Sequence, residues 1–272
     1  MIERCAMKYV KNIGIPVLFL VGYLFLNIAI RLASPDMDTV IVAVFSDLII
    51  WAAGVLYFKF YRQDARIFDI RALGSMFVLM VPFWISVQIM ASYIIENVSD
   101  IGVNAYMSAV DANPVAYSIL TLVIAPITEE ILMRGIMFRH LRNIAPFPVA
   151  ALVSAFVFAF LHGTTAHMYI GMMFGMGFAV IYEYTGQLRY PVLAHVLSNL
   201  LSILGGTLPL PNFLFHAACF IPMNIIWVAV LVFACLWLDR QSKLVTTPLY
   251  IAQNQNFLKN VPDDVSNLVR KG

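Results

Sequence analysis

Two adjacent glutamates, Glu129 and Glu130, lie in an otherwise apolar segment, Ile119–Phe138, and Arg134 follows one helical turn later. This segment has the length and hydrophobicity of a membrane span. A charged side chain near the middle of a bilayer costs about 2.5–3.5 kcal/mol on insertion scales, so such charges are rare and usually functional. The segment therefore predicts acid–base chemistry inside a membrane.

The spacing of these charges assigns them different environments. Glu130 and Arg134 are four residues apart, so they share a helix face and can form an ion pair that offsets much of the burial cost. Glu129 is rotated by about 100° from Glu130, so the same arginine neutralises it less easily. A buried carboxylate without a counterion is suited to take up and return a proton. The alternative is a structural ion pair, with Glu129 reaching the cytoplasmic interface.

Pro126 should also loosen this helix and free backbone carbonyl groups near the glutamates.

Two further polar patterns lie downstream. Phe158 and His162 share a helix face, so the aromatic ring can wall one side of the imidazole. His195 and Asn199 also lie one turn apart on one face, where both can donate hydrogen bonds to an oxyanion. Taken separately, these pairs are also typical of core histidines and of hydrogen bonds between membrane helices. Together with a free carboxylate they are the parts required to hydrolyse an amide bond.

The composition predicts a polytopic membrane protein. The chain has 272 residues, of which 61% are hydrophobic and 12% charged, and its mean hydropathy is +0.85. A soluble domain carries roughly 25% charged residues, so this chain is too apolar to cover itself with a polar surface. The net charge of +2 gives no indication of a nucleic-acid partner. Cys5, Cys219 and Cys235 have no paired spacing, which argues against a disulfide framework or a cysteine zinc site.

Apolar stretches of about 20 residues predict an all-α bundle of about eight transmembrane helices, because a barrel would need short alternating segments. The predicted spans are roughly 13–32, 40–60, 73–95, 115–138, 148–163, 167–184, 190–205 and 213–238. Lysine and arginine gather in the loops on one side, so the positive-inside rule places both termini in the cytoplasm. We expect one transmembrane domain over 1–238, with a catalytic core at about 115–205, and a polar cytoplasmic tail over 239–272.

The three motifs, in this order, resemble those of the CPBP family of intramembrane proteases. This family includes the type II CAAX prenyl endopeptidases and the bacteriocin-processing and Abi proteins. Its motifs E-E-x-x-x-R, F-x-x-x-H and H-x-x-x-(N/B) are all present, and the resemblance covers about Ala116 to Ser202. It implies a multi-pass protein of the bacterial inner (plasma) membrane that cleaves a protein or peptide substrate, with lipidated substrates among the candidates.

The resemblance also implies roles for individual residues. Glu129 and His162 would activate the attacking water, whereas His195 and Asn199 would stabilise the oxyanion. Supporting roles fall to Glu130, Arg134 and Phe158. The family has been described both as metalloproteases and as glutamate-dependent proteases. Zinc held by Glu129, His162 and His195 with one open position therefore stays a possibility, although the absence of an H-E-x-x-H motif favours the metal-free mechanism.

Several points stay open at this level. At about 1.5 Å per residue, His162 comes out roughly 10 Å deeper in the membrane than Glu129 and His195. Either its helix begins further out than Pro148, or the helices are tilted and staggered. Asp47 is a lone carboxylate in the second span, for which a hydrogen bond across helices is expected. Two other functions fit a membrane bundle: an immunity or regulatory protein that binds a partner peptide, and a proton-coupled transporter.

Overall fold

The computed structural model of the chain describes residues 2–60, 87, 113–163, 165–205, 221–222, 224–230, 232–233 and 236. All regular elements in these ranges are helices, in agreement with the predicted all-α class. The predicted span 73–95, apart from residue 87, lies outside the described residues, as do the tail 239–272 and much of the span 213–238.

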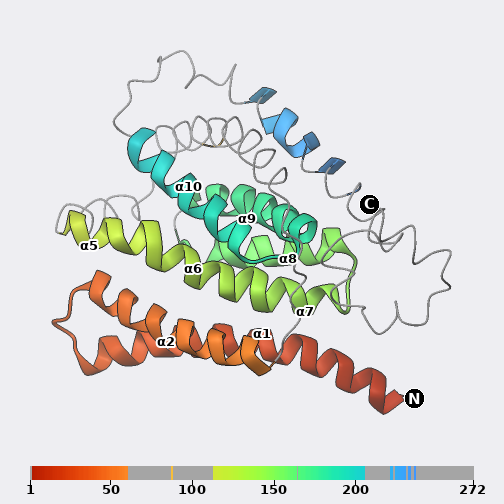
Figure 1. Cartoon of the computed structure of the whole chain (residues 1–272), viewed down its shortest axis with the longest axis horizontal. Helices are drawn as coiled ribbons and strands as arrows, with labels where there is room; N and C mark the ends of the chain where they lie inside the picture. Colours follow the sequence, from red (N-terminus) through yellow and green to blue (C-terminus); the bar gives the residue numbers. More distant parts are fainter. Residues whose placement is uncertain are drawn as a thin grey trace.

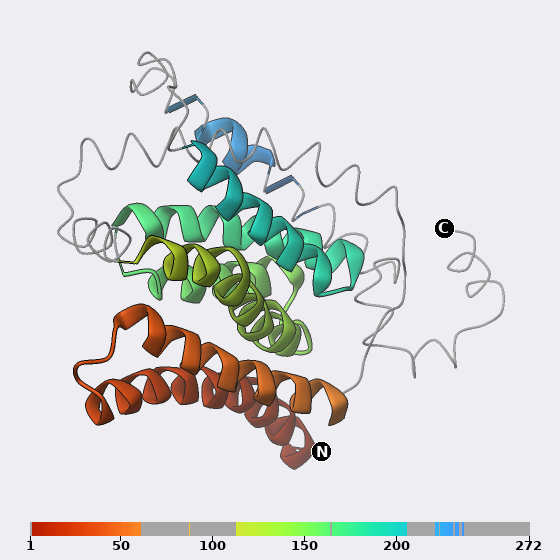
Figure 2. The same ribbon diagram turned by 60° about the vertical axis from the view of Figure 1, so that its left-hand side comes forward.

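The first two helices form an antiparallel hairpin along one side of the molecule (Figure 1). Helix α1 covers Ile2–Ala33 and begins 11 residues before the predicted span 13–32. Helix α2 covers Thr39–Phe60, close to the predicted span 40–60. The carboxylate of Asp38 accepts a hydrogen bond of 2.7 Å from the amide of Val40 and so caps the first turn of α2. Figure 2 shows the hairpin as a separate layer beside the remaining helices.

The next described helix is a continuous rod over Pro114–Arg142 in which α-helical and π-helical segments alternate. Its segments are α5 (Pro114–Ile119), η1 (Leu120–Ile124), α6 (Ala125–Glu130), η2 (Ile131–Phe138) and α7 (Arg139–Arg142). The side chain of Asn113 caps its start by accepting a hydrogen bond from the amide of Ala116. The two glutamates end a short α-helical segment that has a π-helix on each side. π-helical segments are rare in proteins, and those that occur are frequently found at functional sites.

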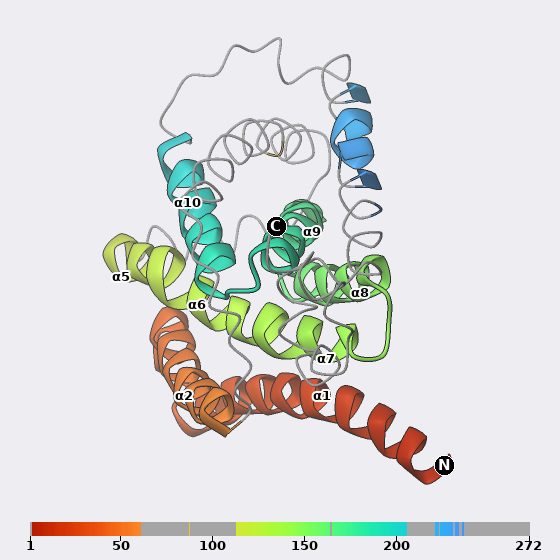
Figure 3. The ribbon, with the colours of Figure 1, turned by 45° about the vertical axis from the view of Figure 1, so that its right-hand side comes forward.

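Three more helices pack on the other side of this rod (Figure 3). They are α8 (Phe147–Phe160), α9 (Thr165–Thr185) and α10 (Arg189–Gly205). Helix α8 ends three residues earlier than the predicted span 148–163, because the chain turns at Gly163, whose φ of 74° favours glycine. His162 therefore lies in the turn after α8 rather than within the helix.

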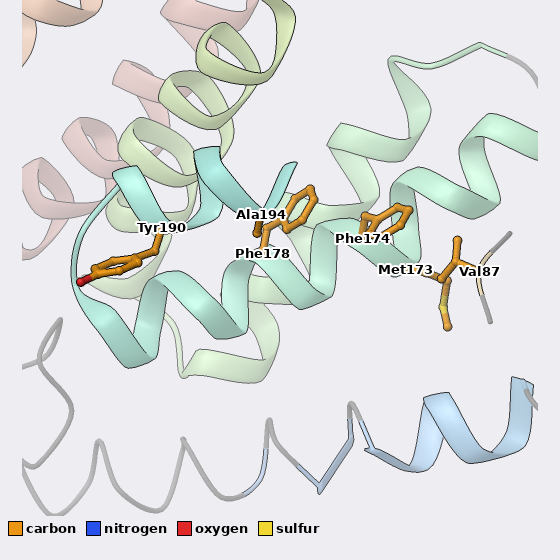
Figure 4. Packing of buried hydrophobic residues seen from close by; sticks show 6 residues of the cluster. All are labelled: Val87, Met173, Phe174, Phe178, Tyr190 and Ala194. Atoms are coloured by element: carbon orange, nitrogen blue, oxygen red, sulfur yellow. The ribbon is translucent and has the colours of Figure 1, made fainter. Parts of the chain in front are cut away.

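A cluster of buried side chains joins α9 to α10 (Figure 4). Phe174 and Phe178 of α9 stack with ring centroids 5.6 Å apart, and Phe178 lies against Ala194 of α10. Val87 packs beside Met173 at the far end of the same cluster. Phe178 is completely buried, so its ring fixes the position of the α10 face that carries His195.

Helix length and composition support a protein embedded in a membrane. In the described part of the chain, three helices are long and apolar enough to cross a bilayer: Met7–Ala33, Thr39–Lys59 and Pro114–Arg142. The apolar helix Phe147–Phe160 is shorter. The total of eight spans and the location of both termini remain predictions.

The contact between α8 and α9 depends on small residues, as expected for the glycine-rich stretch of α9. A Cβ atom added at Gly175 would lie 3.0 Å from the Ala155 Cα atom and 2.9 Å from its Cβ atom. We expect Gly175→Ala to lower the free energy of unfolding by about 1–3 kcal/mol, because the two helices would have to move apart.

Thermal unfolding of the detergent-solubilised protein would measure this effect. Gly22→Ala is the matched control, because a Cβ atom at Gly22 has no other atom within 4 Å. The control should be neutral or slightly stabilising. Equal melting temperatures for the two variants would contradict the assigned packing.

Candidate active site

Arg134 and Glu130 form the predicted ion pair. The Nη1 atom of Arg134 donates to Oε1 of Glu130 at 2.9 Å, and both side chains are fully buried. The Nη2 atom donates to the backbone carbonyl of Gly175 at 2.8 Å. The guanidinium group also lies 4.8 Å from the ring centroid of Phe158 and 5.3 Å from that of Phe178. These cation–π contacts and hydrogen bonds stabilise a charge that has no access to water.

His195 bridges the two glutamates. Its Nδ1 atom lies 3.0 Å from Oε1 of Glu130, and its Nε2 atom lies 3.5 Å from Oε2 of Glu129. Because Glu130 is paired with Arg134, its carboxylate accepts the hydrogen bond and the Nδ1 atom of His195 carries the proton. The imidazole stacks on Phe178 at 4.9 Å, which fixes the ring plane. The Nε2 atom is therefore held facing Glu129.

The two adjacent glutamates differ in their access to the surroundings. The Glu130 side chain has no exposed surface, whereas 31% of the Glu129 side chain is accessible. This difference follows from the rotation between neighbouring helical residues. One carboxylate is thus closed and ion-paired, and the other is open to a small molecule such as water.

His162 lies against the ring of Phe158, the residue four positions before it in the chain. Its Nδ1 atom is 2.7 Å from the Phe158 carbonyl oxygen, so it donates the hydrogen bond and leaves the Nε2 lone pair available. The Phe158 ring meets His162 edge-on at 4.7 Å and His195 at 5.7 Å. Among the described side chains, His162 makes no direct contact with Glu129. The expected Glu129–His162 pair is therefore not in contact in this structure, where Glu129 meets His195 instead.

The boundaries of α8 bear on the depth of His162. This helix begins at Phe147, one residue before the predicted start, which accounts for only about 1.5 Å of the expected difference in depth. The ring of Phe158 contacts both His162 and His195. Tilted and staggered helices stay a prediction.

Asn199 is held by a backbone carbonyl that the central rod leaves free. In η1 the amide of Ala125 bonds to the carbonyl of Leu120, five residues earlier. The next donor in that register is Pro126, which has no N–H group, so the carbonyl of Thr121 lacks a helical partner. The Nδ2 atom of Asn199 donates to this carbonyl at 2.8 Å. This carbonyl lies eight residues before Glu129, so free carbonyl groups near the glutamates stay a prediction. Among the described residues, the second N–H of the Asn199 amide has no hydrogen-bond partner and can serve a substrate.

Two of the three predicted zinc ligands, Glu129 and His195, approach each other. Among the described residues, no group of three or more His, Cys, Asp or Glu side chains is arranged to hold a metal ion. Zinc at this site stays a prediction.

The sequence alone does not identify some of the side chains that surround the site. Phe178 contacts both Arg134 and His195, but the glycine-rich segment in which it lies predicts helix packing alone. Trp51 and Thr128 join α2 to the segment that carries the glutamates. A tryptophan in an apolar span gives no sign of such a contact, because the contact depends on how two helices pack.

The fold and the site together define a helical integral membrane protein with a buried acid–imidazole centre. Residues 111–201 match the sequence model of the family described as type II CAAX prenyl endopeptidase Rce1-like. All seven predicted site residues fall within this segment, which is thus an Rce1-like domain, in agreement with the resemblance drawn from the motifs.

Two curated relatives are similar to part of this chain. The putative membrane peptidase YdiL of Bacillus subtilis (strain 168) is 29% identical over 110 residues, which cover 40% of this chain and 45% of YdiL. The membrane-embedded CAAX protease MroQ of Staphylococcus aureus (strain USA300) is 34% identical over 85 residues, which cover 28% of this chain and 34% of MroQ. The similarity thus spans less than half of each relative. No solved structure gave a significant match to the chain.

Proposed function

We propose that this chain is an intramembrane endopeptidase that hydrolyses a peptide bond of a membrane-associated protein or peptide. One observation supports this most strongly. A continuous series of contacts runs from Arg134 through Glu130 and His195 to Glu129, and only its last carboxylate is open. A structural ion pair requires Arg134 and Glu130 alone. The histidine and the second glutamate are the groups that proton transfer requires.

Glu129 is the general base in the proposed reaction. It takes a proton from a water molecule, whose oxygen attacks the carbonyl carbon of the scissile bond. The Nε2 atom of His195 shares this proton, because it faces Glu129 at 3.5 Å. Glu130 accepts a hydrogen bond from the Nδ1–H group of His195, which fixes the imidazole in the required tautomer and orientation. The carboxylate of a catalytic triad has the same task.

His162 and Asn199 complete the site. The unused Nε2 atom of His162 accepts a hydrogen bond from the attacking water. The proton held by Glu129 and His195 passes to the leaving amine nitrogen as the C–N bond breaks. The second N–H of the Asn199 amide donates to the oxyanion of the tetrahedral intermediate. We therefore assign His195 to proton transfer with Glu129, which differs from the oxyanion role that the family resemblance implies.

The surroundings of the site support one substrate class. The described helices bury polar groups and expose many large apolar side chains, so a substrate with an apolar segment can approach through the bilayer. We propose a peptide with a membrane-embedded or lipidated segment, and a prenylated cysteine near the C-terminus is the first case to test. A bacterial plasma membrane is the proposed location.

A comparison of membrane proteomes tests the proposed function and does not require an identified substrate. Cells that lack the protein would be complemented with the wild-type chain, Glu129→Ala or His162→Ala, and new peptide termini would be mapped by mass spectrometry. We expect at least one terminus that is present with the wild type and absent with both variants. Asp36→Asn, a change at an exposed loop carboxylate, should leave the terminus unchanged.

The alternative of an immunity or regulatory protein leads to a different outcome. A protein that only binds a partner peptide has no need for an ionisable group at position 129. Its phenotype would persist in Glu129→Ala, and no terminus would depend on that residue. That result, with the variant correctly inserted, would reject the protease.

A further inference from the structure

Helix α2 packs closely against the helix that carries the glutamates, although it precedes the Rce1-like segment 111–201. A Cβ atom added at Gly54 of α2 would lie 2.7 Å from the Cγ2 atom of Ile131, and one added at Gly135 would lie 2.6 Å from the Phe58 ring. Figures 2 and 3 both place α2 beside the central rod. Two close apolar contacts therefore dock α2 on this rod.

A polar contact occurs at the level of the glutamates. The indole Nε1 atom of Trp51 donates a hydrogen bond of 2.7 Å to the hydroxyl of Thr128. Thr128 is completely buried, and its hydroxyl also lies 3.1 Å from the carbonyl oxygen of Ile124. Thr128 directly precedes Glu129, so this contact fixes the backbone from which the open carboxylate extends.

Asp47 extends this polar contact. It lies one turn before Trp51 on α2, and only 2% of its surface is exposed. Its carboxyl group interacts with Thr128 and with Tyr23 of α1. The Oδ1 atom has no hydrogen-bond partner among the described residues. Burial of a carboxyl group with an unsatisfied oxygen is unfavourable, and the glycine contacts already dock the helix. Helix packing therefore does not explain why an acidic residue occupies this place.

Glu129 depends on such support because its own contacts are weak. Its closest polar neighbour is the Nε2 atom of His195 at 3.5 Å, which is longer than an ordinary hydrogen bond. Glu130, by contrast, accepts two bonds of 2.9 and 3.0 Å. The direction of the Glu129 carboxylate is thus set mainly by the backbone at Thr128 and Glu129.

We propose that Trp51 and Asp47 are positioning residues, which fix Thr128 and through it the general base Glu129. The N-terminal hairpin is then a part of the active site and not only a scaffold. This inference rests on the proposed protease function, because it assigns Glu129 a catalytic orientation that α2 maintains. Both residues act through Thr128, so their loss should lower kcat more than it changes KM.

Thr128→Val tests the proposal, because valine keeps the shape of threonine and removes the hydroxyl. In proteoliposomes with a farnesylated CAAX peptide as probe, we expect kcat to fall by about 10- to 100-fold with KM nearly unchanged. Trp51→Phe should have the same effect, and Thr128→Ser should restore most of the rate. Ser46→Ala is the matched control, since among the described residues the Ser46 hydroxyl bonds within α2, to the carbonyl of Val42.

A second measurement needs no substrate. Modification of Glu129 by dicyclohexylcarbodiimide would be followed by mass spectrometry in the full-length protein in liposomes. We expect faster labelling in Thr128→Val and Trp51→Phe than in the wild type, because the carboxylate is no longer held. Thr128→Ser and Ser46→Ala should label at the wild-type rate.

The two measurements separate the possible failures. Altered labelling without any cleavage by the wild type would reject the proposed protease activity on this peptide and retain the positioning of Glu129. Unchanged labelling and kcat in both Thr128→Val and Trp51→Phe would overturn the positioning role. Equal losses in Thr128→Val and Thr128→Ser would overturn it as well, since the hydroxyl would then be irrelevant.

Discussion

Replacement of Glu129 by glutamine is expected to lower kcat by roughly 10²–10⁴-fold, the usual contribution of general acid–base catalysis. Glutamine keeps the size and polarity of the side chain but cannot accept the proton of the attacking water. Because Glu129 is only partly buried and has no ion-pair partner as close as that of Glu130, its loss should leave folding almost unaffected. KM should change little, since the lost interaction belongs to the transition state.

Initial rates of peptide cleavage in proteoliposomes would measure this effect, with the melting temperature as a check on folding. Asp36→Asn is a matched carboxylate-to-amide change in an exposed loop and should keep the wild-type rate. A Glu129→Gln protein with wild-type kcat would remove the general base from the mechanism. In this variant the Nε2 atom of His195 faces an amide. An unchanged kcat would therefore also mean that this atom needs no acidic partner.

Replacement of Arg134 by methionine is expected to be the most destabilising of the changes considered, at about 3–5 kcal/mol. Methionine fills a similar volume but leaves Glu130 as a fully buried carboxylate with His195 as its remaining partner. Such an uncompensated charge is far more costly than the absence of the whole pair. The two cation–π contacts with Phe158 and Phe178 are lost as well.

A second substitution should separate this effect from simple loss of packing. In the double variant Glu130→Gln with Arg134→Met the buried charge is removed, so much of the stability should return. Activity should stay low, because a neutral amide holds the Nδ1 proton of His195 less strongly than a carboxylate. Unfolding of the detergent-solubilised protein would give the stabilities, and peptide cleavage would give the rates. Arg31→Met, at an exposed arginine, should lie within about 0.5 kcal/mol of wild type.

A stability equal to that of wild type for Arg134→Met alone would contradict this assignment. It would mean that Glu130 is buried without its charge, and that the ion pair does not orient His195. Equal losses in the single and double variants would instead show that Arg134 acts through its packing between two aromatic rings.

The π-helical segments give the central rod its functional shape. In η1 the five-residue register and Pro126 together release the carbonyl of Thr121, which then holds Asn199 of a different helix. An uninterrupted α-helix would bond its own carbonyls and offer none to a neighbouring side chain. The irregular backbone is tolerated inside a membrane because a side chain from another helix satisfies the freed group.

The sequence by itself determined what depends on spacing along one helix. It placed Glu130 and Arg134 in an ion pair, distinguished Glu129 from its neighbour, and put Phe158 against His162. It also located the described helices after α1 to within about four residues at each end, because long apolar runs bounded by polar residues have one stable form in a bilayer. The motif order was sufficient to identify the family segment.

Only the tertiary structure decided which groups from different helices meet. The family resemblance implied that Glu129 and His162 act together, yet the helices bring His195 to Glu129, and the Phe158 ring contacts both histidines. Contacts between helices depend on tilt, rotation and the positions of small residues such as Gly54. A linear pattern records none of these quantities. The sequence thus supplied the chemical groups, and the packing of the helices decided how they are paired.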